Sequence, residues 1–251
     1  MPDVRLRVLA LVAGLILAGC SQEAGKATDS TPTVPIVQPS PEPGPGGPVA
    51  SKPGRSALPL GEGFDFYVLS LSWSPSYCEA EGEEANRQQC ATERPYAFVV
   101  HGLWPQFERG FPESCDTSEP DVANATLRTL YDIMPSAGLI RHQWRKHGSC
   151  SGLGQEDYFD VLRAARETVS IPAEFRRLDS YRTLDPDDAE AAFLRANDSL
   201  PRDGIAVTCD KRYLREVRLC LTRDLEFRSC PEVDRRDCRL ARVVMPPVRG
   251  G

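Results

Sequence analysis

Nine cysteines occur in this chain of 251 residues, and such a number is typical of proteins from an oxidising compartment, where thiols form disulfide bonds. Because nine is an odd number, at least one thiol has another fate. Eight of the cysteines follow Cys20, and they can pair in roughly a hundred ways, among which the sequence alone does not choose. Short intervening loops favour Cys78–Cys90 and Cys220–Cys230; the others are Cys115, Cys150, Cys209 and Cys238.

Residues 1–20 have the composition of an export signal. Arg5 and Arg7 precede an apolar run over 8–17, which is too short to span a membrane and ends in Leu-Ala-Gly-Cys. This ending resembles the bacterial lipoprotein signal, in which the cysteine, here Cys20, is acylated and becomes the new N-terminus. Ordinary cleavage after Gly19 is the alternative and would leave Cys20 as a free thiol. The lipoprotein interpretation accounts for the odd cysteine.

That interpretation predicts a lipid anchor on Cys20, and therefore a protein of the bacterial cell envelope, on the periplasmic side, or a secreted one. Residues 21–63 contain no Phe, Trp or Tyr and are rich in proline, so they cannot bury enough apolar area to fold. We expect them to form an extended tether. Residues 64–251 then form a single domain, large enough for a hydrophobic core.

The order of apolar patterns in this domain predicts an α+β fold. Strands are expected at both ends and helices between them. The expected strands are 64–73, which Pro75 would end, 96–100, 205–207 and 217–221, with 225–228 as a further candidate. The expected helices are 122–134, 139–147, 156–169 and 187–196. The acidic stretch 79–84 is expected to be a solvated loop.

The three histidines of the chain fall in two short motifs. His101 follows the apolar run 96–100, where we expect it to end a strand, and opens His-Gly-Leu-Trp-Pro. His142 and His147 lie in the segment His-Gln-Trp-Arg-Lys-His-Gly-Ser-Cys. On a helix, Gln143 lies one turn from His147, and His142 one turn from Lys146. One helical surface would therefore present two imidazoles, an ammonium group and an amide to a histidine on a strand.

Two imidazoles suit a reaction in which one proton leaves while another is delivered near neutral pH. A neighbouring ammonium group suits negative charge that accumulates on phosphorus. Cleavage of a phosphodiester by the 2′-hydroxyl of its own substrate needs both and needs no metal. The net charge of −6 excludes a basic protein that binds nucleic acid by general phosphate neutralisation, so any such activity must lie in a local site.

Two other interpretations of the histidines exist. They could be ordinary polar residues, although all three falling in two motifs argues against this. They could also be zinc ligands, but the five-residue separation of His142 and His147 differs from the four-residue separation in His-Glu-x-x-His. No Cys-x-x-Cys motif is present either, so we expect neither a metal nor another cofactor.

The two histidine segments closely resemble the active-site segments of the ribonuclease T2 family, in the same order and at a similar separation. Residues 64–78, 216–220 and 227–231 resemble the first and the C-terminal strands of that family. The resemblance implies a central antiparallel sheet packed against helices, and transesterification of RNA through a 2′,3′-cyclic phosphate. It also implies the disulfides Cys115–Cys150 and Cys209–Cys238, the latter enclosing Cys220–Cys230.

The resemblance further implies roles for individual residues. His147 would act as general base on the 2′-hydroxyl, and His101 would protonate the leaving 5′-oxygen. Lys146 would stabilise charge at phosphorus, and His142 would hold a phosphate. The assignment of acid and base to the two histidines is its least secure part. Gln143 stands where the family usually carries Glu, so the site loses a negative charge and a titrating group.

Trp104, Phe107 and Phe111 lie where the family places its base pocket, with core packing as the alternative, whereas Trp144 is expected in the core. The arginines Arg212, Arg215, Arg218 and Arg223 could attract RNA, but they are expected to be only solubilising. We therefore expect a metal-independent endoribonuclease that acts on single-stranded RNA, as a monomer without an obligate protein partner. The alternative is an RNA-binding envelope protein that keeps the fold but is catalytically impaired by Gln143.

Overall fold

The computed structural model describes residues 58–91 and 95–249. The predicted signal, its Cys20 and most of the predicted tether lie outside these residues. The last part of the tether, 58–63, is packed against the domain: Leu58 contacts the core, and the Glu62 amide donates to the Ser151 carbonyl at 2.9 Å. The packed part of the chain therefore begins before Phe64.

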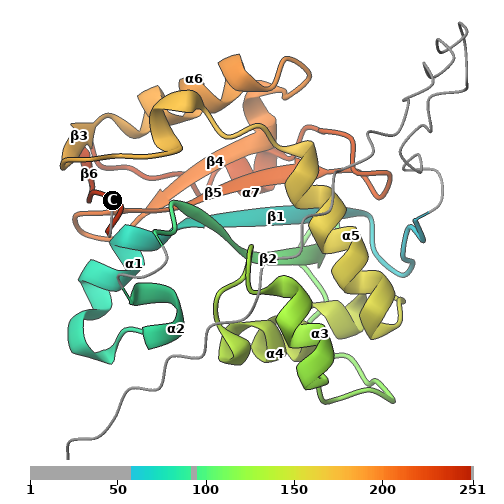
Figure 1. The fold of residues 1–251 in the computed structure, drawn as a ribbon. Helices are drawn as coiled ribbons and strands as arrows, with labels where there is room; N and C mark the ends of the chain where they lie inside the picture. The colour runs from blue at the N-terminus through green and yellow to red at the C-terminus, as the bar shows by residue number, and fades with distance from the viewer. Residues whose placement is uncertain (1–57, 92–94, 250–251) are drawn as a thin grey trace, which may run out of the picture. The chain divides into compact units, whose positions relative to one another are not determined.

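A four-stranded antiparallel sheet forms the centre of the domain and confirms the predicted α+β fold (Figure 1). The strand order is β2-β1-β5-β4, so the two ends of the domain meet in one sheet. A separate two-stranded antiparallel sheet pairs β3 with β6. The strands are β1 (Phe66–Trp73), β2 (Phe98–Gln106), β3 (Arg182–Leu184), β4 (Ile205–Cys209), β5 (Leu214–Leu221) and β6 (Val243–Met245).

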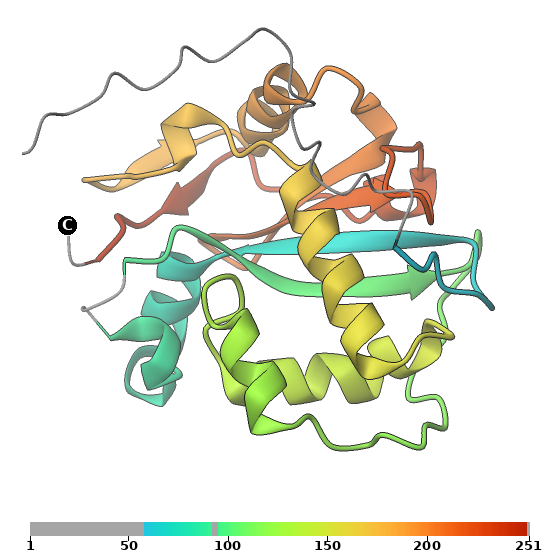
Figure 2. The same cartoon turned by 45° about the vertical axis from the view of Figure 1, so that its right-hand side comes forward.

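Helices from the middle of the chain cover the sheet, and α5 lies across β1 and β2 in both views (Figures 1 and 2). The face of α5 predicted to be apolar is buried, as its Tyr158, Phe159, Leu162 and Ala165 show. The α-helices are α1 (Ser74–Glu81), α2 (Arg87–Cys90), α3 (Asn124–Leu130), α4 (Ala137–Lys146), α5 (Gln155–Thr168), α6 (Pro186–Ala196) and α7 (Pro231–Asp234). Short 3-10 turns are η2 (Gly82–Glu84), η3 (Gly148–Cys150), η4 (Ala173–Phe175) and η5 (Arg202–Gly204). No described helix is long and apolar enough to cross a membrane.

The sheet separates two apolar clusters because successive side chains of a strand point to opposite faces. Along β1, Tyr67, Leu69 and Leu71 belong to the main core, which also contains residues of α4, α5 and α6. Phe66 and Val68 belong to a smaller cluster on the other face, with Cys220, Cys230 and Val233. Trp104 of β2 packs against this smaller cluster, which is the side on which the histidines lie.

Several predicted elements differ from the observed ones. Pro75 does end β1, but it lies in the first turn of α1, where a missing amide proton costs nothing, so a helix follows directly. The predicted helix 122–134 is shortened to α3, and 225–228 forms only an isolated bridge from Phe227 to Leu221. The three-residue strands β3 and β6 were not predicted, because they are too short to show a pattern.

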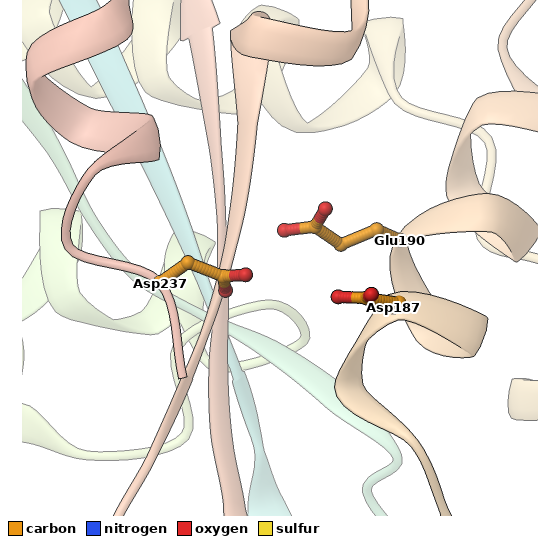
Figure 3. A group of neighbouring side chains, drawn as sticks. All are labelled: Asp187, Glu190 and Asp237. Atoms are coloured by element: carbon orange, nitrogen blue, oxygen red, sulfur yellow. The ribbon is translucent and has the colours of Figure 1, made fainter. Parts of the chain in front are cut away.

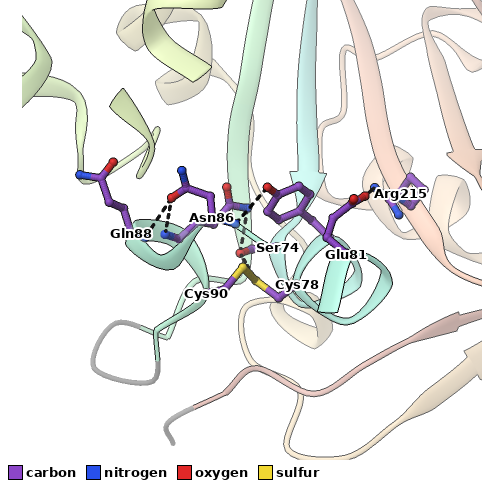
Figure 4. The surroundings of a disulfide bond; sticks show 9 residues. Ser74, Cys78, Glu81, Asn86, Gln88, Cys90 and Arg215 are labelled. Carbon is purple, nitrogen blue, oxygen red and sulfur yellow. Dashed lines mark hydrogen bonds and ion pairs between the residues drawn. A yellow bond between two sulfur atoms is a disulfide. The ribbon is translucent and has the colours of Figure 1, made fainter. Parts of the chain in front are cut away.

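The acidic stretch 79–84 is largely exposed, as expected, but it is not a loop. It continues α1 and turns into η2, and two of its carboxylates bind neighbouring elements. Glu79 accepts hydrogen bonds from the hydroxyls of Tyr181 and Tyr213, both at 2.8 Å. Glu81 pairs with Arg215 of β5 at 3.3 Å (Figure 4). These bonds attach α1 to strand β5 and to the segment before β3.

Four disulfides link the described cysteines as Cys78–Cys90, Cys115–Cys150, Cys209–Cys238 and Cys220–Cys230, in agreement with the expected pairs. The first joins α1 to α2, beside the Asn86 side chain that caps α2 by accepting from the Gln88 amide (Figure 4). The fourth lies in the smaller apolar cluster behind the histidine pocket.

Candidate active site

His101 lies in the middle of β2, not at its end as the sequence had indicated. The strand continues to Gln106, but its register against β1 shifts at this point: Ser70 pairs with Gly102 and Leu71 pairs with Val100. His101 is therefore the extra residue of a β-bulge, a distortion that re-aims a side chain without ending the strand.

Helix α4 carries the other histidine motif. It begins at the Ser136 cap, whose hydroxyl accepts from the Leu139 amide, and ends at Lys146, one residue earlier than predicted. His147 is the C-terminal cap, and its amide still donates to the Gln143 carbonyl at 2.9 Å. Trp144, expected in the core, is 1% exposed there, so its burial fixes which side of α4 faces the pocket.

The indole of Trp104 lies between the two motifs. Its ring centroid is 5.6 Å from that of His101 and 5.3 Å from that of His147. Its Nε1 donates to Oε1 of Gln143 at 2.8 Å, which ties β2 to α4. A side chain at Gly102 would place its Cβ 2.1 Å from Gln143 Oε1, so only glycine permits this approach.

The histidines open into one pocket of about 280 Å³. All residues predicted for catalysis or substrate contact line it, namely His101, Trp104, Phe107, Phe111, His142, Gln143, Lys146 and His147. Phe107 and Phe111 are 40% and 42% exposed, so their rings belong to the pocket wall and not to the core. A turn closed by the bond from the Phe107 amide to the Gly110 carbonyl, at 3.0 Å, carries them.

The environment favours the neutral form of two of the imidazoles. Burial, and then the positive charges of Lys146, His142 and His101, lower the pKa of His147 to about 3. Burial and the charge of Lys146 also lower the pKa of His142. His147 is 8% exposed, and its Nδ1 has no hydrogen-bond partner among the described residues. A neutral imidazole can accept a proton, so His147 has the protonation state that a general base requires.

Two acidic groups that contact residues of the pocket, Glu216 and Glu113, were missed in the sequence analysis, as was one basic group that lines it, Arg218. Glu216 of β5 contacts Nδ1 of His101, and Arg218, expected to be merely solubilising, lines the pocket. Lys146 pairs with Glu113 at 3.4 Å. The signal for Glu216 and Arg218 was present as two charges two residues apart in a strand, which places both on one face.

Of the residues that the structure describes, one group of three carboxylates could hold a cation, and it shares no residue with the histidine pocket. Asp187 and Glu190 of α6 point toward Asp237, on the segment after α7 (Figure 3). Glu190 and Asp237 each accept from the same Val207 amide at 3.0 Å. Burial and the mutual repulsion of the carboxylates raise the pKa of Glu190, and burial raises that of Asp237.

We expect this pair to make the stability of the fold depend on pH. Because the folded-state pKa of Glu190 is raised, stability is full in acid and falls as pH rises through the raised value. Glu190→Gln keeps the bond from Val207 and removes the charge, so at mildly alkaline pH it should be about 1–2 kcal/mol more stable than the parent. Urea unfolding across this pH range measures the difference. Asp198→Asn, at an exposed carboxylate, is the control and should change little; equal pH slopes for parent and Glu190→Gln would contradict the prediction.

A sequence profile described as the Ribonuclease T2 family matches residues 64–230 of this chain. A ribonuclease of Aeromonas hydrophila is 33% identical over 176 residues, which cover 64% of this chain and 73% of that protein. Ribonuclease I of Escherichia coli is 26% identical over 204 residues, 64% of this chain and 76% of the relative. Among solved structures, an RNase-related protein from Calystegia sepium has a TM-score of 0.59 at 19% identity, covering 74% of this chain and 98% of that one. RNase NT, solved with 5'-AMP, has a TM-score of 0.51 at 24% identity, covering 68% and 92%.

Proposed function

This chain belongs to the ribonuclease T2 family, and from that premise we propose that its pocket cleaves single-stranded RNA without a metal, by attack of the 2′-hydroxyl on the adjacent phosphorus. The chain is an endoribonuclease of the T2 type. What is proposed here is the mechanism: the step forms a 2′,3′-cyclic phosphate and breaks the bond to the 5′-oxygen of the next nucleotide.

In the proposed mechanism His147 takes the proton of the 2′-hydroxyl. The low pKa of His147 keeps its imidazole neutral from mildly acidic pH upward, so a proton acceptor is available. His101 gives a proton to the leaving 5′-oxygen, and the carboxylate of Glu216 contacts its Nδ1. The surroundings of the two histidines differ: His147 is nearly buried and its Nδ1 has no partner among the described residues, whereas Nδ1 of His101 contacts a carboxylate.

Lys146 and His142 would act on the phosphate. Lys146 ends α4 and carries its ammonium group into the same pocket, where it would stabilise negative charge developing at phosphorus. His142 lies one helical turn earlier and would hold a phosphate oxygen. One observation carries the proposal: the imidazoles of His101 and His147 both flank Trp104 in a single pocket, with Lys146 beside them.

The direct test is the cleavage of an RNA oligonucleotide in excess chelator, followed by mass analysis of the new ends. We expect chelator-resistant cleavage with 2′,3′-cyclic phosphate ends. Loss of activity in chelator would instead support the zinc interpretation of the histidines. Absence of cleavage by the folded, fully oxidised protein between pH 4 and 8, with RNA binding retained, would support the alternative of an impaired RNA-binding protein.

We propose that Phe107, Phe111 and Trp104 hold an unpaired base by stacking. Phe107→Ala and Phe111→Ala should each raise KM for an RNA oligonucleotide about tenfold, since stacking of one base contributes about 1–3 kcal/mol. The kcat should change little, because neither ring takes part in proton transfer. Tyr181→Ala removes an aromatic ring that is 57% exposed and outside the pocket, and it should leave KM unchanged. An unchanged KM in both phenylalanine variants would assign base binding elsewhere.

A substitution at Gln143 tests whether the missing negative charge limits the rate of cleavage. Gln143→Glu keeps an oxygen that can accept from Trp104 Nε1, and it adds a charge among His142, Lys146 and His147. The added charge should raise the pKa of His147 and move the acidic limb of the pH–rate profile upward by about one unit. Gln106→Glu, in the same pocket, is the matched control. If the rate of Gln143→Glu equals that of the parent at every pH, the amide imposes no such limit.

We also propose that the enzyme acts in the bacterial cell envelope, or is secreted, with acylated Cys20 as its membrane anchor and 21–57 as part of the tether. The supporting observations are the Leu-Ala-Gly-Cys ending and the four disulfides, which suit an oxidising compartment outside the cytoplasm. Mass spectrometry of the N-terminal peptide distinguishes an acylated Cys20 from a free thiol. A chain that begins at Cys20 without lipid would contradict the anchor.

A further inference from the structure

Glu216 joins one of the two proposed proton-transfer groups to the sheet beneath it. Its Oε1 contacts Nδ1 of His101, and its Oε2 accepts from Nε and NH2 of Arg218 at 2.9 and 2.7 Å. The Glu216 side chain is 11% exposed, against 34% for His101. Both oxygens of a nearly buried carboxylate are thus occupied, one by an imidazole and one by a guanidinium group.

This contact crosses a whole strand, because β1 lies between β2 and β5. Two features of the sheet make it possible. The bulge at His101 re-aims the imidazole, and β1 has small side chains on this face, where Ser70 pairs with Gly102 on one side and Arg218 on the other. Ser72 likewise pairs with Glu216. A larger side chain at either serine would stand between the imidazole and the carboxylate.

The charge state of Glu216 suits a role as acceptor. Burial alone would raise the pKa of Glu216, but the hydrogen bond and charge of His101, together with Arg218, outweigh it and lower this pKa to about 2. The group is therefore a carboxylate throughout the range in which the enzyme would work, and a carboxylate only accepts hydrogen bonds. Nδ1 of His101 must then carry the proton of this contact, which leaves Nε2 to exchange a proton with the substrate.

We propose that Glu216 is a positioning residue for His101: it fixes the Nδ1–H form and the orientation of the ring, so that Nε2 faces the leaving 5′-oxygen. Arg218 holds Glu216 in turn. Its guanidinium group donates to the second carboxylate oxygen and lies over the Trp104 ring, 5.1 Å from the ring centroid. The inference rests on the proposed function, because it assigns His101 the role of acid. Glu216 itself touches no reacting atom, so its role is distinct from those of the residues in the proposed mechanism.

The test compares Glu216→Gln with the parent on two substrates. One is an RNA dinucleotide, whose leaving alkoxide needs a proton. The other is a nucleoside 3′-(4-nitrophenyl phosphate), whose leaving phenolate needs none. We expect the variant to lose about 10- to 100-fold in kcat on the dinucleotide, as is typical when a group that orients a functional histidine is lost. On the nitrophenyl ester the loss should be threefold or less.

Two controls separate positioning from a general effect. Glu226→Gln removes an exposed carboxylate just after β5 and should match the parent on both substrates. Combined with His101→Ala, Glu216→Gln should cost nothing further, because its effect passes through His101. Equal losses on the two substrates, or an additional loss in the His101→Ala background, would overturn the proposal. If the parent cleaves neither substrate, the proposed function fails instead.

A spectroscopic measurement keeps the proposal testable if the variant does not fold. Two-bond proton–nitrogen correlation spectra of the ¹⁵N-histidine-labelled parent distinguish the two neutral forms of each imidazole. At a pH where His101 is neutral, we expect its proton on Nδ1, and Glu216→Asp should weaken that preference. A parent His101 with its proton on Nε2 would overturn the proposal without any variant.

Discussion

The variant His147→Ala should cleave RNA about a thousandfold more slowly than the parent, the loss expected when a general base is removed. The loss should fall on kcat, because the imidazole acts on the 2′-hydroxyl in the transition state and adds little to ground-state binding. Initial rates on an RNA oligonucleotide, with the product ends analysed by mass, measure the effect. Slow residual cleavage should still give cyclic phosphate ends, since Lys146 and His101 remain.

The pH dependence of the parent gives an independent check on the same residue. Because the pKa of His147 is lowered to about 3, the acidic limb of kcat/KM should lie far below the pH at which an ordinary histidine becomes protonated. His142→Ala is the matched control, since it removes a second imidazole from the same helix and leaves the proposed base. We expect it to weaken phosphate binding and to leave the acidic limb within about half a unit of its position. An acidic limb near pH 6.5 that disappears in His147→Ala would show that the site does not depress this histidine.

Removing the Cys115–Cys150 disulfide should lower the free energy of unfolding by about 3–4 kcal/mol, as the 35-residue separation implies for a cross-link that restricts the unfolded chain. The double variant Cys115→Ala/Cys150→Ala should also lose activity under conditions where it is folded. The disulfide and the bond from the Ser114 amide to the Lys146 carbonyl, at 2.8 Å, hold the 113–115 segment against the end of α4. Released from that contact, Glu113 would no longer fix the ammonium group of Lys146.

The disulfide Cys209–Cys238 provides the matched control because its separation of 29 residues gives a similar entropic effect. Its removal should cost comparable stability, measured by urea unfolding. It should leave kcat within about twofold, since neither cysteine lines the histidine pocket. Equal losses of kcat in the two double variants, assayed where both are folded, would show that Cys115–Cys150 contributes only to stability.

Much of the site could be predicted because helical spacing is local information. The separation of His142, Gln143, Lys146 and His147 determines that they share a helix surface, whatever the rest of the chain does. Phe107 and Phe111 were assigned to the pocket through the family resemblance, and the turn that carries them follows directly after β2. The end of α4 differs by a single residue from its predicted position, as helix ends usually do.

The part that could not be predicted depends on strand register. Glu216 meets His101 only because β1 separates β2 from β5, and only because a bulge shifts one strand by a residue. Neither fact is visible in a single strand, since strand order and register depend on the neighbouring strands. Pro75 shows the complementary error: it was correctly assigned as the end of a strand, but its equal suitability for starting a helix was overlooked.

The division of the sheet into a core face and a pocket face has a consequence for how this enzyme can evolve. Substitutions at neighbouring positions of β1 should affect different properties of the protein. Leu69 and Leu71 are completely buried in the main core, so substitutions there should lower stability. Ser70 and Ser72 pair with Arg218 and Glu216 beneath the contact between His101 and Glu216, so substitutions there should also change turnover. Phe66 and Val68, on the same face as the serines, are buried in the smaller apolar cluster, so in a saturation library along this strand the positions that alter turnover should be confined to the end beside His101.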